Sequence, residues 1–206
     1  VYILALAVLG LIRRLPLALC FVVGQAGGAL MWLILPGYRR LARENLTIAF
    51  GRELSPSQIR RLAFKHFTTL GANVVSAIKI PALAHDAIDR IATIENLDLI
   101  RQNIAKGRPV LLAINHIGNW ELYASSYQVP EARFGTVYQA LHNKLVDDLV
   151  NSDRRRLGVL TFDRKEGYQG ALALLREPGI LGVLVDQHAG NSGVWTPFFG
   201  RLCSTS

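Results

Sequence analysis

The chain has 206 residues, half of them hydrophobic, and its 23 Lys and Arg against 15 Asp and Glu give a formal net charge of +8. This length suits one sizeable domain, or a domain with a small appendage. A basic and apolar chain suits an anionic membrane surface or an anionic substrate, while the lack of any nucleic-acid motif and the apolar N-terminal part argue against nucleic acid. Two cysteines, Cys20 and Cys203, form no disulfide framework, which indicates a reducing compartment.

Two apolar runs open the sequence. Residues 1–12 are too few to cross a bilayer, which needs about 20 residues. Residues 15–35 have spanning length, and Gly24 and Gly28 within them have the spacing of small residues in closely packed helices. Either run predicts a membrane anchor; for the second, a helix packed on the domain or lying in the membrane interface is the alternative. Arginines on both sides of the second run leave its orientation open.

Two amphipathic helices are predicted next. Residues 38–50, YRRLARENLTIAF, form a basic amphipathic pattern that favours membrane contact over a solvated surface helix. Residues 55–80 begin with Ser55 as an N-cap and proline at the first helical position, and their apolar residues recur every three or four positions. His66 lies on this helix among aromatic residues, where we interpret it as a packing or surface histidine.

From residue 90 onward short apolar runs alternate with helical patterns, which predicts an α/β sheet flanked by helices. The predicted strands lie in RIATIE, PVLLAI, FGTVYQAL, GILGVLVD and VWTPFFG, and the predicted helices in LDLIRQNIAKG, the segment from Asn119, KLVDDLVNSDRRRLG and GYQGALALLRE. The predicted organisation is therefore an apolar membrane-associated segment over 1–36, amphipathic helices over 37–89, and an α/β core over 90–206.

Polar side chains follow three of the predicted strand ends, where α/β proteins usually keep their sites. The first end carries Asn115, His116 and Glu121; the second, reached through TFDRKEG, carries Asp163, Arg164 and Lys165; the third carries Asp186, Gln187 and His188. These residues are the candidates for the site.

Among these candidates, His116 and Glu121 form the pair that most clearly suggests a catalytic base and its carboxylate partner. An imidazole acts as a general base near neutral pH, and a carboxylate on its other ring nitrogen would fix the tautomer and stabilise the imidazolium. The spacing H-x4-E alone is a weak signal. No second histidine or cysteine pair supports a metal site, and no serine or cysteine sits at a nucleophile elbow, so covalent catalysis is not indicated.

The segment NHIGNWEL at 115–122 resembles the H-x4-(D/E) block of the glycerolipid acyltransferase superfamily, and its H-x-GNWEL form is similar to that of the lipid A biosynthesis lauroyl and myristoyl acyltransferases. RRLARENLTIAF, FDRKEG and LVDQHAGNSGVWTPFFGR resemble further blocks of that family in the same order. Together these matches run from about Arg39 to Arg201 and are specific to the family.

The resemblance implies transfer of a fatty acyl chain from an acyl-carrier-protein thioester to a hydroxyl of a lipid A precursor, at the cytoplasmic face of a bacterial inner membrane and without a cofactor. His116 would be the general base and Glu121 would orient it. Asn115 and Asn119 would hold the turn or donate hydrogen bonds, and Arg164 would bind a phosphate or phosphopantetheine group. Asp186 would support the site by hydrogen bonding.

The resemblance has two departures. The family usually has an acidic residue where this chain has His188, and it continues well beyond PFFGR, which together with the lack of an initiator Met predicts a fragment.

For Arg164, a surface salt bridge to Asp163 or Glu166 is the alternative interpretation. Two other functions stay open: a phospholipid or glycolipid acyltransferase of the same superfamily, and a membrane-binding module without turnover.

Overall fold

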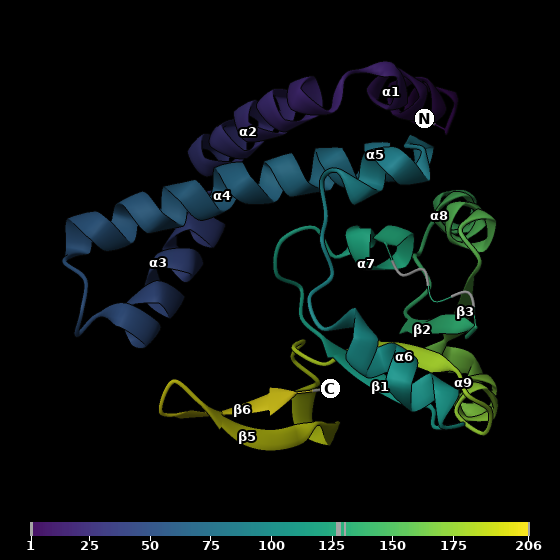
Figure 1. Ribbon diagram of the computed structural model, residues 1–206. Coiled ribbons are helices and arrows are strands. Elements are labelled where there is room, and N and C mark those ends of the chain that lie inside the picture. The colour runs from purple at the N-terminus through teal and green to yellow at the C-terminus, as the bar shows by residue number, and fades with distance from the viewer. Residues whose placement is uncertain (1, 127–128, 130, 206) are drawn as a thin grey trace. The chain divides into compact units, whose positions relative to one another are not determined.

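The computed structural model describes residues 2–126, 129 and 131–205, and its contacts divide the chain into two units. The helical unit comprises residues 3–79 with residues 195–203, and the α/β unit comprises residues 80–194 with residues 204 and 205. Figure 1 colours the chain from its N-terminal helices to its C-terminal strands.

The helical unit contains four helices. They are α1 (Tyr2–Arg14), α2 (Leu17–Ile34), α3 (Pro36–Phe50) and α4 (Pro56–Lys79) (Figure 1). The predicted cap of α4 is confirmed, because the backbone N–H of Gln58 donates to Ser55 Oγ at 3.4 Å while the backbone N–H of Ser55 donates to Gln58 Oε1 at 2.8 Å. This reciprocal pair is a capping box, which satisfies two N–H groups at the helix start.

Helix α2 packs on α4 through a stripe of small residues. The buried residues of α2 recur every fourth position, at Cys20, Gly24, Gly28 and Trp32. A Cβ atom on Gly24 would overlap the carbonyl oxygen of Gly71 on α4, and one on Gly28 would overlap that of Phe67. Glycines at these positions therefore let the two backbones touch, as the small-residue spacing in the sequence predicts.

We expect Gly28→Ala to destabilise the helical unit by about 1 to 3 kcal/mol, because the new methyl group forces the α2 and α4 backbones apart. Gly27→Ala is the matched control: its Cβ would meet nothing within 4 Å, so it should be neutral or stabilise by up to about 1 kcal/mol through helix propensity. Urea unfolding of the full chain in detergent, followed by circular dichroism, measures both. Equal effects of the two substitutions would contradict the close crossing.

Among the described residues, α2 is the one helix whose length and hydropathy suit a membrane crossing, with a mean hydropathy of 2.0 over 18 residues. Outside its buried stripe, α2 exposes large apolar side chains such as Val22 and Leu33, which are 62% and 69% exposed. Helix α1 has 13 residues and is too short to cross by itself.

The α/β unit carries a four-stranded sheet with helices on both faces. Its strands are β1 (Val110–Ile114), β2 (Phe134–Tyr138), β3 (Val159–Asp163) and β4 (Ile180–Leu184), and its helices are α5 (His85–Asp89), α6 (Leu97–Ala105), α7 (Glu121–Ser126), α8 (Lys144–Arg156) and α9 (Gln169–Leu174). Short 3₁₀ turns, η1 (Ile80–Ala82), η2 (Arg164–Glu166) and η3 (Gly190–Ser192), complete it. The α/β expectation is confirmed.

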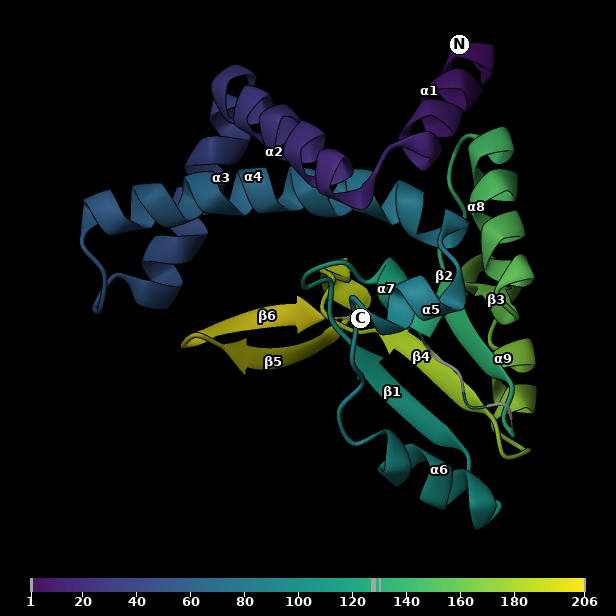
Figure 2. The same cartoon turned by 45° about the horizontal axis from the view of Figure 1, so that its top comes forward.

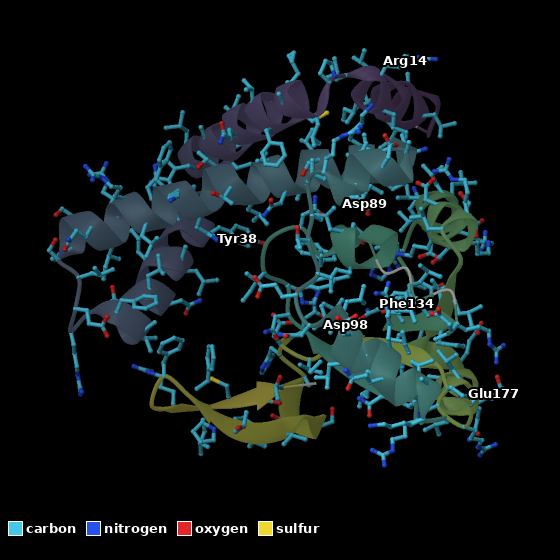
Figure 3. The ribbon with its side chains drawn as sticks, in the orientation of Figure 1. Arg14, Tyr38, Asp89, Asp98, Phe134 and Glu177 are labelled. Atoms are coloured by element: carbon cyan, nitrogen blue, oxygen red, sulfur yellow. The ribbon has the colours of Figure 1, made fainter. Side chains whose placement is uncertain are left out.

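The sheet has strand order β1-β4-β2-β3, and all its pairings are parallel, as Figure 2 lets the reader follow. Side chains alternate between the two faces. On one face Phe134, labelled in Figure 3, packs with Ile180 and with Ile104 of α6; on the other, Leu181 packs with Leu174 of α9. β4, which has strands on both sides and is largely buried, explains the continuous apolar run GILGVL in the sequence. β1 lies at the edge of the sheet, and its Leu111 is 63% exposed although PVLLAI is equally apolar.

Two details of the predicted sheet are corrected. The sheet is not mixed, because each connection between its strands passes through a helix and so returns the chain in the same direction; β5 (Val194–Phe198) and β6 (Arg201–Thr205) instead form a separate two-stranded sheet. Residues 90–95, expected as a strand, form an irregular link between α5 and α6.

A two-residue turn joins β5 to β6. Phe199 and Gly200 have φ values of +47° and +72°, the pair of positive values that a type I′ hairpin turn requires. Every residue of β5 is exposed. Within the helical unit, the ring of Phe199 meets that of Phe50 at the end of α3, with centroids 5.7 Å apart.

Candidate active site

The polar residues of the predicted site follow the carboxyl ends of the parallel strands. His116 comes two residues after β1 ends, and Asp186 comes two residues after β4 ends. In the pairing of β1 with β4, Ile114 lies opposite Leu184. Two more residues along each strand bring position 116 opposite position 186, so neighbouring strands with matched register deliver the two side chains to one place.

The imidazole of His116 is held by the carboxylate of Asp186. His116 Nδ1 lies 2.6 Å from Asp186 Oδ1, and the backbone N–H of His116 donates to Asp186 Oδ2 at 2.7 Å. Both side chains are partly buried, 25% and 33% exposed. A carboxylate that accepts from both the ring and the backbone of one residue fixes the position of that ring.

The other ring nitrogen of His116 contacts Gln187, whose Nε2 lies 3.3 Å from His116 Nε2. Because an ionised carboxylate only accepts hydrogen bonds, the neutral ring must carry its proton on Nδ1. His116 Nε2 is then an acceptor, and the Gln187 amide donates to it. The ring of Trp120 meets that of His116 edge to face, with centroids 5.2 Å apart. His116 is therefore held on three sides, with its basic nitrogen at Gln187.

Asp186 stays ionised at neutral pH. Burial alone would raise the pKa of its carboxyl group, but the hydrogen bonds from the ring and backbone of His116 and the ring's charge together outweigh burial and lower the pKa below its ordinary value of 3.8. The negative charge that the tautomer of His116 requires is thus present in the folded protein.

The carboxylate of Glu121, the first residue of α7, forms an ion pair with Arg154 of α8, with 2.7 Å between Oε1 and Nη2. Their side chains are 21% and 17% exposed. The sequence-based expectation was that Glu121 orients His116, whereas the carboxylate found on His116 Nδ1 is that of Asp186. Glu121 borders the same cavity as His116, so its part in the chemistry stays a prediction.

A cavity of about 620 Å³ opens at these strand ends, within the size range of small-molecule sites. His116, Glu121 and Arg164 line it together with Arg154 and Tyr138. Asn115 is exposed and borders a separate small pocket, and Asn119 lies in the turn before α7 and accepts the backbone N–H of Leu122. His188 forms an isolated antiparallel bridge with Thr205 through its backbone.

Several residues at this cavity were not predicted from the sequence as site residues. Arg154, Tyr138 and Asp147 reach it from α8 and from the end of β2; they lie within ordinary helix and strand patterns and carry no motif. Gln187, which directly follows a predicted strand end, was already among the candidates, but the sequence assigned it no role. Among the side chains that the structure describes, no group of three His, Cys, Asp or Glu is placed to hold a metal ion.

Comparison with known proteins places this architecture in a family. A model of the bacterial lipid A biosynthesis acyltransferases matches residues 1–205. The chain belongs to this family. It is also 26% identical, over 197 residues, to the lipid A biosynthesis lauroyltransferase of Escherichia coli strain K12. That alignment covers 95% of this chain and 63% of the relative, so the chain spans less than two thirds of the relative's length.

Membership of the lipid A biosynthesis acyltransferase family confirms the resemblance first seen in NHIGNWEL. The matched range includes His116, Glu121, Arg164 and Asp186, all of which the structure gathers at the carboxyl ends of the sheet.

Proposed function

We propose that the protein transfers a fatty acyl chain from an acyl-carrier-protein thioester to a hydroxyl of a lipid A precursor. Family membership and the name of the Escherichia coli relative support this reaction. The single observation that carries it is the ring of His116, which has Asp186 on Nδ1 and an acceptor Nε2, bonded to the Gln187 amide, beside a cavity of substrate size. This is the arrangement that a general base needs.

In the proposed reaction the substrate hydroxyl replaces the Gln187 amide at His116 Nε2. The ring takes the hydroxyl proton as the oxygen attacks the thioester carbonyl, and Asp186 stabilises the imidazolium that forms. The tetrahedral intermediate collapses with cleavage of the C–S bond, the new ester is released, and the ring returns the proton to the departing thiolate. General-base assistance of this kind contributes about 10²- to 10⁴-fold in rate.

The charged residues of the cavity suit the rest of the substrates. A guanidinium recognises phosphate through paired hydrogen bonds, and both proposed substrates carry phosphate groups. Arg164, on the 3₁₀ turn after β3, is exposed at the cavity and is the proposed phosphate ligand. Arg154 also lines the cavity, where the carboxylate of Glu121 positions its guanidinium and offsets its charge.

The experiment is a transfer assay with lauroyl-acyl-carrier-protein and a phosphorylated lipid A precursor, using the full chain in detergent. Formation of the lipid product with one more acyl chain is the expected result. Incorporation into glycerol 3-phosphate instead would indicate a phospholipid acyltransferase of the same superfamily. Lipid binding without consumption of any thioester would contradict the proposal and favour a membrane-binding module.

We further propose that the helical unit attaches the enzyme to the cytoplasmic face of the inner membrane. Residues 3–79 and 195–203 contain eleven Lys and Arg but only two acidic residues, Glu44 and Glu53, a net charge of +9. The α/β unit, over residues 80–194, has thirteen acidic and twelve basic residues. Positive charge therefore accompanies the exposed apolar surface of α2, a combination that suits anionic lipid.

Binding to phosphatidylglycerol vesicles should accordingly weaken when the basic residues of α3 are neutralised. Because each Lys or Arg at an anionic surface contributes about 1 kcal/mol, the double variant Arg40→Gln/Arg43→Gln should bind about tenfold or more weakly in a flotation assay at low salt. Arg176→Gln, an exposed substitution in the α/β unit, should bind as the unmodified chain does. Equal loss in both variants would contradict attachment through the helical unit.

A further inference from the structure

The hydroxyl of Tyr138 is a polar group at the cavity that the proposed reaction does not use. Tyr138 is the last residue of β2, and it lies opposite Asp163 in the pairing with β3. Its side chain lines the same cavity as His116 and Arg164. Because β2 is hydrogen-bonded to β4, Tyr138 stands at the end of the strand next to the one that delivers Asp186.

A hydrogen-bond network at the cavity wall fixes the direction of this hydroxyl. The Nδ2 amide of Asn151 on α8 donates to the hydroxyl oxygen of Tyr138 at 3.0 Å and to Asp147 Oδ2 at 3.1 Å. Asp147 Oδ1 in turn accepts the backbone N–H of Leu141 at 2.8 Å. Since an amide NH₂ group only donates, the tyrosine oxygen is the acceptor, and its own O–H remains to be donated.

The side-chain amide of Asn151 is only partly hydrogen-bonded. Its side chain is buried, and its Oδ1 atom has no hydrogen-bond partner among the residues that the structure describes. A buried amide oxygen without a partner is uncommon in folded proteins. Within the same described set, Asn151 is also the one hydrogen-bond partner found for the Tyr138 hydroxyl. The NH₂ group of Asn151 thus connects Tyr138 to Asp147.

The charges around Tyr138 define what it can bind. Burial raises the pKa of Tyr138 above its ordinary value of 10.0, and the negative charges of Asp147, Asp163 and Glu166 raise it further. The hydrogen bond from Asn151 lowers the pKa but does not outweigh these effects. The hydroxyl therefore keeps its proton at neutral pH. The same carboxylates disfavour an anionic group at this position, whereas a neutral carbonyl or hydroxyl oxygen accepts the hydrogen bond without repulsion.

We propose that Tyr138 donates a hydrogen bond to an uncharged oxygen of a substrate, a carbonyl or a sugar hydroxyl, inside the cavity. Asn151 and Asp147 are its positioning residues. The assignment rests on the proposed function only in taking this cavity as the substrate site. On this assignment the cavity binds two kinds of substrate group. Arg164 and Arg154 bind the anionic groups, and Tyr138 binds an uncharged oxygen.

The test is Tyr138→Phe, which removes one oxygen and leaves the Asn151 amide bonded to Asp147, so the fold should be retained. We expect kcat/KM to fall about tenfold for one of the two substrates, the one that carries the bonded oxygen, with the KM of the other unchanged and no change in thermal midpoint. Tyr38→Phe, the same chemical change at an exposed position on α3, should leave both values as they were.

A binding measurement separates this assignment from the reaction itself. In a His116→Ala background, in which turnover should be slow enough to leave binding at equilibrium, adding Tyr138→Phe should raise the dissociation constant of either lauroyl-acyl-carrier-protein or the lipid A precursor about tenfold. If the unmodified chain transfers no acyl group, the proposed function fails, yet these dissociation constants still decide the role of Tyr138. Values within twofold for both substrates, or a uniform loss accompanied by a lower thermal midpoint, would overturn it.

Discussion

Replacing His116 with alanine should lower kcat for acyl transfer by about 10²- to 10⁴-fold. The hydrogen bond from His116 Nδ1 to Asp186 keeps the ring proton on Nδ1. Nε2 is therefore left as the proton acceptor at the cavity. Without the ring, the attacking hydroxyl must lose its proton to water as it forms the tetrahedral intermediate. The rate of thioester consumption, measured with saturating lipid A precursor, gives the effect directly.

The variant is expected to keep its fold, because the side chain is partly exposed and lies beyond the end of β1. His66→Ala is the matched control: His66 is exposed on α4 in the helical unit, and its loss should leave kcat unchanged. A His116→Ala variant with near-normal turnover and a normal thermal midpoint would refute the assignment of the base.

The second large effect is expected for Asp186→Asn. The asparagine oxygen can still accept the backbone N–H of His116, so the loop after β4 should keep its position. Its NH₂ group, however, would face Nδ1 as a donor and favour the tautomer with the proton on Nε2, which cannot accept the substrate proton. We expect kcat to fall about 10²- to 10⁴-fold, with little change in KM, because Asp186 acts through the ring.

Two further variants make this result specific. Asp98→Asn removes a carboxylate from an exposed ion pair on α6 and should leave kcat unchanged. Glu121→Gln probes the carboxylate that the sequence assigned to the ring: it breaks the pair with Arg154, so its main effect should be a raised KM for the phosphate-bearing substrates. A large kcat loss in Glu121→Gln with a near-normal Asp186→Asn would restore Glu121 as the partner of His116.

Much of the α/β unit could be predicted from the sequence. The runs PVLLAI, FGTVY and GILGVL are apolar, short and bounded by glycine or polar residues, and each proved to be a strand of the parallel sheet. Ser55 and Pro56 correctly marked the start of α4. RIATIE was wrongly predicted: its isoleucines and threonine suit a strand, but residues 90–95 pair with none of the described strands and form an irregular link between α5 and α6.

The partner of His116 could not be predicted, for a physical reason. Sequence shows which polar residues follow each strand but not which strands are neighbours. Glu121 was favoured because it is five residues from His116, whereas Asp186 is seventy residues away and reaches the ring only because β4 lies beside β1 with matched register. Tyr138 and Asn151 were missed for the same reason: strand order and helix packing bring them to the cavity.

The most direct test of the central claim is mass spectrometry of lipid A from bacteria that lack their own lauroyltransferase and express this protein. Cells with the unmodified protein should regain a lipid A species with one additional acyl chain, and cells with His116→Ala at equal expression should not. Restoration by both proteins, or by neither while the unmodified protein is folded and at the membrane, would contradict an acyltransferase that works through His116.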